Sequence, residues 1–124
     1  MTESRKHPVV RHRDETQRID CPFGHVQRIV TGGEGGIANV HVVKITKGTP
    51  HLHQSYDETY FVLSGTGTIT LGPETHPLRT GTVAVIPAGV QHSLQAAPGQ
   101  VLEFVIFGTP PMAMDDERTR PRKE

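Results

Sequence analysis

Hydrophobic and polar residues alternate in short stretches along most of this chain, which is typical of β-strands with one buried face. In residues 37–46, every second side chain from Ile37 to Ile45 would lie on one face of a strand. Gly and Pro separate the stretches, as turns between short strands require. The stretches expected to form strands are residues 25–31, 37–46, 59–63, 68–71, 75–78, 82–86, 92–97 and 101–107, and residues 20–24 have the composition of a turn.

Many short strands at regular spacing predict an all-β fold, an antiparallel barrel or jelly roll. The length of 124 residues suits one domain, and 13 glycines with 10 prolines argue against long helices. We expect a single barrel over residues 19–108. Residues 1–18 are rich in charge and would form a mobile arm, or an arm that adds a strand to a partner subunit through Pro8, Val9 and Val10. Residues 109–124 would form a charged C-terminal tail.

The charge balance argues against two classes of partner. Lys plus Arg number 13 and Asp plus Glu number 13, so no overall field favours nucleic acid or a membrane surface. Cys21 is the single cysteine, which excludes an intramolecular disulfide and fits a reducing compartment. No apolar run has the length of a signal or membrane-spanning segment, so we expect a cytoplasmic protein.

Four side chains of types that bind metal ions occur at spacings that would bring them together in a sheet. His51 and His53 are two residues apart, Glu58 follows five residues later, and His92 begins another predicted strand. In an extended stretch the two histidines would point the same way, and Glu58 would share its strand face with Tyr60 and Val62. Imidazole nitrogen and carboxylate oxygen suit borderline divalent ions such as Fe, Mn, Ni, Zn and Cu.

These residues also carry a resemblance to a known family. The segment His51-x-His53-x4-Glu58-x6-Gly65, followed by Gly81-x5-Pro87-x-Gly89-x2-His92, resembles the two motifs of the cupins, in particular the small single-domain ones. Two positions depart from the family pattern: Gly48 lies three instead of six residues before the first histidine, and Ala96 replaces an Asn that is not a metal ligand. The resemblance implies a cupin barrel, a homodimer, and one divalent ion per chain held by His51, His53, Glu58 and His92.

Other residues near these motifs are candidates for catalysis. Tyr60 would share the Glu58 face and could donate a hydrogen bond, act as an acid, or simply pack in the core. His41 lies among apolar neighbours and could make a structural hydrogen bond or contact a substrate. Tyr56 and Asp57 would rim the mouth of the barrel. We therefore predict Tyr60 and His41 as the catalytic candidates.

Four functions remain open. The first is an oxygenase-type mononuclear metalloenzyme, in which apolar walls formed by Val62, Ile86 and Leu94 would enclose a small organic substrate. The second is a sugar or sugar-phosphate isomerase, which should direct basic residues into the barrel; Lys44 and Arg79 are not obviously inward. The third is a metal-dependent lyase or cyclase that uses bound water. The fourth is a non-enzymatic binding or sensor module. We expect an enzyme before a binding module, and an oxygenase before an isomerase.

Overall fold

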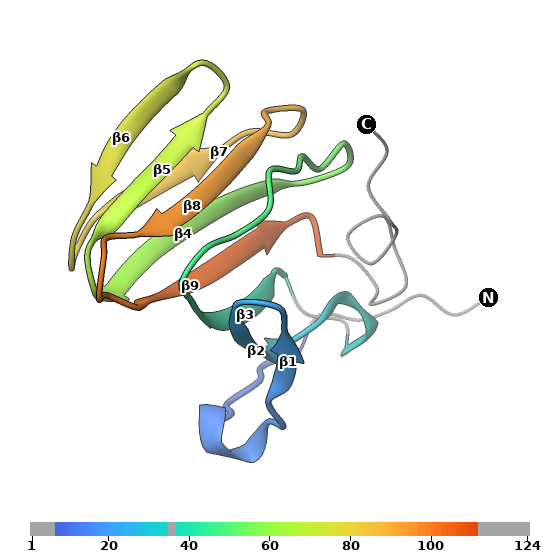
Figure 1. Ribbon diagram of the computed structural model, residues 1–124. Helices are drawn as coiled ribbons and strands as arrows, with labels where there is room; N and C mark the ends of the chain where they lie inside the picture. Colours follow the sequence, from blue (N-terminus) through green and yellow to red (C-terminus); the bar gives the residue numbers. More distant parts are fainter. Residues whose placement is uncertain (1–6, 35–36, 112–124) are drawn as a thin grey trace.

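The computed structural model describes residues 7–34 and 37–111, and antiparallel β-strands dominate this part of the chain (Figure 1). Two short 3-10 turns, η1 (Arg13–Glu15) and η2 (Gly32–Glu34), accompany the strands. The strands are β1 (Ile19–Cys21), β2 (Gly24–Val30), β3 (Asn39–Ile45), β4 (Asp57–Ser64), β5 (Gly67–Leu71), β6 (Glu74–Leu78), β7 (Val83–Ile86), β8 (His92–Ala96) and β9 (Leu102–Thr109).

The strands form two sheets that face each other across one apolar core. The larger sheet has the order β1-β2-β3-β9-β4-β7, and the smaller one, β6-β5-β8, lies over β4, β7 and β9 (Figure 1). Every strand pair is antiparallel, so the predicted all-β antiparallel fold is confirmed. Both sheets contribute to the buried cluster, which consists of Val43, Ile45, Tyr60, Val62, Ile69, Leu78, Ala84, Ile86, Leu94, Ala96, Leu102 and Phe104.

Each predicted strand is present, and its ends lie within two residues of the expected positions. The turn predicted for residues 20–24 is wrong in part, because Ile19–Cys21 forms β1 and pairs with β2 before the chain reverses at residues 21–24. Three exposed residues are too few to show an alternating pattern, so this strand had no signal in the sequence.

Strand β4 has one buried face and one exposed face. Glu58 and Tyr60 are buried on its inner face, whereas Phe61 is exposed on its outer face. Along one row across the large sheet, Glu58 pairs with Gly108 of β9 on one side and Ile86 of β7 on the other. This row lies near the end of the sandwich where β4 and β8 begin, and the apolar core fills the space beyond it.

Two glycines of the motifs shape turns at opposite ends of the sandwich. Gly65 has a φ of 91° in the turn after β4, and a Cβ there would overlap the carbonyl oxygen of Val101, so a larger residue does not fit. Gly89 has a φ of 89° in the corner between β7 and β8. Its N–H donates to the carbonyl of His53 at 2.7 Å, which links this corner to the loop before β4.

The N-terminal segment contacts the outside of the large sheet. Arg11 forms an ion pair with Glu34 at 2.8 Å, and Arg13 donates to both Gln27 of β2 and Glu103 of β9. The addition of a strand to a partner subunit by this arm stays a prediction. Residues 1–6 and 112–124, the latter including most of the expected tail, lie outside the described residues. Across the ranges 7–34 and 37–111, no helix has the length and apolar character needed to cross a membrane.

Candidate metal centre

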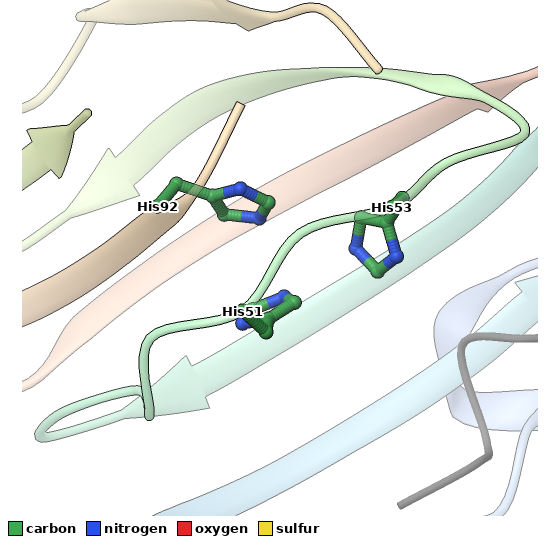
Figure 2. A group of neighbouring side chains, drawn as sticks. All are labelled: His51, His53 and His92. Atoms are coloured by element: carbon green, nitrogen blue, oxygen red, sulfur yellow. The ribbon is translucent and has the colours of Figure 1, made fainter. Parts of the chain in front are cut away.

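Three histidines meet at one end of the sandwich. His51 and His53 come from the loop between β3 and β4, and His92 is the first residue of β8. Figure 2 shows their rings turned toward a common space, and their potential ligand nitrogens all lie within 4.8 Å of one another. The ring centroids are 4.3 Å apart for His51 and His92, 4.9 Å for His51 and His53, and 5.4 Å for His53 and His92. The sequence spacing thus predicted correctly which histidines come together.

Backbone hydrogen bonds explain why the loop brings its histidines to β8. The N–H of His51 donates to the carbonyl of His92 at 3.0 Å, and the N–H of His92 donates back at 2.8 Å. Two residues along, Gly48 donates to the carbonyl of Leu94 at 2.9 Å. The loop therefore pairs with the free edge of β8 like a short extra strand. Residues two apart in an extended segment lie on the same face, so His53 points to the same side as His51.

Glu58 faces two of these histidines from the large sheet. Its side chain is buried, and its Oε1 lies 3.4 Å from Nε2 of His53 and 3.6 Å from Nε2 of His92. The hydroxyl of Tyr60 donates to the same oxygen at 3.0 Å. The fourth predicted ligand therefore lies beside the three histidines, with a phenol holding its orientation, an arrangement common around metal ligands.

The ring nitrogens of the histidines fit a metal ion. Nδ1 of His51 lies 2.8 Å from the carbonyl of Thr49, and Nδ1 of His92 lies 3.0 Å from that of Val90. A carbonyl only accepts hydrogen bonds, so both rings carry a proton on Nδ1, which leaves Nε2 as the nitrogen that can bind a metal ion.

In His92 this Nε2 has no hydrogen-bond partner in the described part of the chain. It is buried, and it lies 3.6 Å from the carboxylate oxygen of Glu58. A divalent cation bound between the two would satisfy both the buried nitrogen and the buried carboxylate, so the residues present fit such an ion.

Burial and the neighbouring rings together set the protonation states that metal binding needs. Loss of water around His51, together with the neighbouring His92, lowers the pKa of His51 to about 4, so its ring is neutral at pH 7. Burial alone would raise the pKa of Glu58, but the nearby rings of His53 and His92 outweigh it and hold the pKa below the usual range. Neutral imidazole and ionised carboxylate are the forms that bind metal ions.

Tyr60 lies where the sequence placed it, on the inner face of β4. Burial raises the pKa of its phenol well above the usual value, and the charge of Glu58 raises it further. The phenol therefore keeps its proton and acts as a hydrogen-bond donor to Glu58.

The expectation that Tyr56 rims the mouth of the barrel is wrong. Its side chain is only 2% exposed, its ring stacks on His53 with centroids 4.5 Å apart, and its hydroxyl lies 2.7 Å from Nδ1 of His53. Asp57 is exposed and accepts a hydrogen bond from the N–H of Ala88 at 2.8 Å, so it holds the corner before β8. The residues around Tyr56 are polar and do not indicate that its side chain is buried. The path of the loop alone determines this burial.

The interior face of β3 carries His41, which is 3% exposed. Its cross-strand neighbours are Ile106 of β9 and Arg28 of β2. Arg28 shares its face with Val26, which packs against the core, so a basic residue does lie on the inner face of the large sheet. The sequence pattern does not single out Arg28, because it does not show which face of residues 25–31 points inward.

The other side chains assigned from the pattern lie as follows. Lys44 and Arg79 are exposed, as expected. Val62, Ile86 and Leu94, expected to wall a pocket, are packed members of the core cluster. The described residues also line cavities of about 500 Å³ beside Arg13, Gln27 and Glu103 and of about 450 Å³ beside Lys47 and the outer faces of β5 and β8, and none of the three histidines is among their lining residues.

Comparison with known proteins gives the family. The family model described as a cupin domain matches residues 39–108. An uncharacterized protein of Streptomyces coelicolor is 39% identical over 61 residues, which cover 49% of this chain and 55% of that protein. The L-ectoine synthase of Vibrio campbellii is 32% identical over 75 residues, which cover 58% of this chain and 59% of that enzyme. The match therefore spans little more than half the length of these relatives.

The solved structures agree on the fold. The structure of KdgF from Halomonas sp. superposes with a TM-score of 0.73 at 22% identity, covering 88% of this chain and 98% of that one. The matched family region contains all three histidines and every core strand from β3 to β9. Because the family model covers more than half of the sequence, this protein belongs to the cupin family, as its two motifs predicted.

Proposed function

We propose that this protein is a metalloenzyme in which His51, His53, Glu58 and His92 hold one divalent metal ion per chain. The observation that carries this proposal is Nε2 of His92, which is buried without a hydrogen-bond partner among the described residues and lies 3.6 Å from a carboxylate oxygen, next to two further imidazoles. A bound ion would lower the pKa of a water ligand or polarise an oxygen of a small organic substrate.

The side chains around the ligands would orient them and the substrate. Tyr60 fixes one oxygen of Glu58, and carbonyls fix the rings of His51 and His92. His41 lies on the same inner surface as Tyr60 and would contact a substrate that reaches past the ligands. Because four protein ligands leave two positions of an octahedral ion open, we place first an oxygenase-type reaction, which needs room for substrate and dioxygen.

A second candidate is an isomerase, lyase or cyclase reaction. Arg28 favours it, since a guanidinium on the inner face could hold the acidic group of an anionic substrate. Similarity to an L-ectoine synthase points the same way, because that relative is named for a synthase reaction. A non-enzymatic binding module would use the same pocket residues without turnover.

Metal analysis of protein purified without a histidine tag tests the proposal. We expect close to one divalent ion per chain in the wild type. His92→Ala should lose most of it, because His92 supplies a ligand that no neighbouring group replaces. The matched control is His76→Ala, which removes an exposed histidine of β6 that hydrogen-bonds only Glu74 among the described residues and should leave the metal content unchanged. Full retention of metal in His92→Ala would overturn the ligand assignment.

Oxygen consumption then separates the reaction classes. Stoichiometric iron together with oxygen uptake on one member of a panel of phenols, diketones and thiols would support the oxygenase. Zinc, nickel or manganese without oxygen uptake would favour the second candidate, and turnover of an organic acid that is lost in Arg28→Gln would support it further. A wild type that carries no metal would refute both.

A further inference from the structure

The three histidines differ in the group that each Nδ1 meets. For His51 and His92 this group is a backbone carbonyl, which can only accept, so the proton of each ring is fixed on Nδ1. For His53 it is the hydroxyl of Tyr56, at 2.7 Å. A hydroxyl can donate or accept, so His53 alone among the three has a partner that permits either neutral tautomer.

The buried carboxylate of Glu58 selects one of these tautomers when no metal is bound. An ionised carboxylate away from water is costly unless donors surround it. Tyr60 supplies one O–H at 3.0 Å. Nε2 of His92 makes no hydrogen bond at 3.6 Å, whereas Nε2 of His53, at 3.4 Å from Oε1, is close enough to direct an N–H at the same oxygen.

We propose that Tyr56 is a positioning residue that lets His53 exchange tautomers between the metal-free and the metal-bound protein. In the metal-free protein, the Tyr56 hydroxyl donates to Nδ1 and the proton on Nε2 faces Glu58. With a metal ion bound, Nε2 needs its lone pair, so the ring gives up the Nε2 proton to water and takes one from water on Nδ1. The ring carries one proton in both states, and the Tyr56 oxygen turns from donor to acceptor.

The packing of Tyr56 suits this role. Its ring stacks on His53 with an angle of 26° between the planes, and its side chain is almost completely buried. On the other side it lies against Gly108, where a Cβ would come within 3.6 Å of the Tyr56 ring. The hydroxyl is thereby held at a fixed place, and Tyr56→Phe would keep the stack while removing only the oxygen.

Ring nitrogen NMR of ¹⁵N-labelled protein at pH 7.5 tests the assignment directly, because it distinguishes the two neutral tautomers and the charged ring. In chelator-treated wild type we expect His53 with its proton on Nε2, and His51 and His92 with theirs on Nδ1. After addition of zinc, all three should carry the proton on Nδ1. A metal-free His53 that carries its proton on Nδ1, or is doubly protonated, overturns the proposal without any variant.

Zinc affinity of Tyr56→Phe, measured by competition with a chelating dye, is the second readout. Loss of the acceptor for the Nδ1 proton should weaken zinc binding about 10-fold to 100-fold, as for other groups that hold ligating histidines. The matched control is His76→Ala, which removes an exposed histidine of β6 and should leave both the zinc affinity and the His53 signals unchanged. Wild-type affinity in Tyr56→Phe overturns the proposal.

This inference rests on the proposed metal centre only for its zinc-bound half. A wild type that binds no zinc would refute that centre, while the metal-free spectrum would still confirm or refute the tautomer of His53. The two failures are therefore distinguishable.

Discussion

His51 illustrates how burial prepares a side chain for metal binding at a cost in acid stability. Its pKa falls from 6.5 to about 4 in the folded protein, mainly because the ring is out of water. Between these two values the unfolded chain binds a proton that the folded chain does not, so the free energy of unfolding decreases as the pH falls from about 6.5 to 4. We expect urea denaturation of the metal-free protein to show this loss.

The variant His51→Gln separates this effect from that of other groups. Glutamine does not titrate, so the decrease between pH 6.5 and 4 should become smaller in the variant. Glu58 also lowers the free energy of unfolding as the pH falls, but in a lower pH range. Its pKa is depressed in the folded protein, so the stability that it contributes is lost as the pH falls below about 4.5. An unchanged slope in His51→Gln would mean that His51 is not the group responsible.

At the scale of residues, the sequence indicated the proposed ligands more clearly than the side chains that contact them. His51, His53, Glu58 and His92 follow from spacing and strand alternation, because each sits at or beside a regular element. Tyr56 does not, since its contact with His53 depends on the fold of an irregular loop. Arg28 required the register between β2 and β3, which a single sequence does not specify.

At the scale of elements, the turn after β4 depends on Gly65 for two separate reasons. Its φ of 91° is unfavourable for other residues, and a Cβ would overlap the carbonyl oxygen of Val101. Gly81 has a similar φ of 92°, but a Cβ there would meet no atom within 4 Å. These two motif glycines therefore form a matched pair that separates backbone strain from steric overlap.

We predict that Gly81→Ala lowers the free energy of unfolding by about 1–2 kcal/mol, the usual penalty of a left-handed conformation. Gly65→Ala should lower it clearly more, because the turn must also move away from Val101 and the start of β9. Urea denaturation of both variants, followed by circular dichroism, measures the difference. Equal losses would show that the turn relaxes and that the overlap costs nothing.

The strands themselves were predictable because most have one buried and one exposed face, and the period of two marks them directly. The exception was β1, which is exposed on all three residues and owes its pairing to the adjacent β2. Sheet order was accessible only through the family resemblance, because the adjacent strands β3 and β9 are separated in the sequence by residues 46–101.

At the scale of the whole molecule, the described part of the N-terminal arm, residues 7–18, lies on the face of the large sheet opposite Glu58 and Tyr60. Deletion of residues 1–11 removes the ion pair of Arg11 with Glu34 but keeps the contacts of Arg13. We expect the metal content to stay unchanged and the stability to fall by no more than about 1 kcal/mol, the usual value of a partly exposed ion pair. Elemental analysis and thermal unfolding of the truncated protein measure both. A loss of metal would show that the arm contributes to the metal centre.

The outer face of β9, β4 and β7 is the surface on which we expect a second copy of the chain. Phe61, Val83, Val85 and Phe107 are each at least 40% exposed there. Phe61 pairs with Val83 on one side and Val105 on the other, so the apolar side chains are neighbours and form one patch. An exposed apolar sheet face of this kind is stabilised by burial against an identical face across a twofold axis.

We therefore predict a homodimer, with twice the 13.6 kDa chain mass in size-exclusion chromatography with light scattering. Val85→Glu should give a monomer at the same concentration, because burying this face would bring an unpaired carboxylate from each copy out of water. Thr68→Glu adds the same charge to the outer face of β5, on the other sheet, and should remain dimeric. A dimer that survives Val85→Glu must use another surface, and a wild-type monomer at high concentration would leave the apolar face for a different partner.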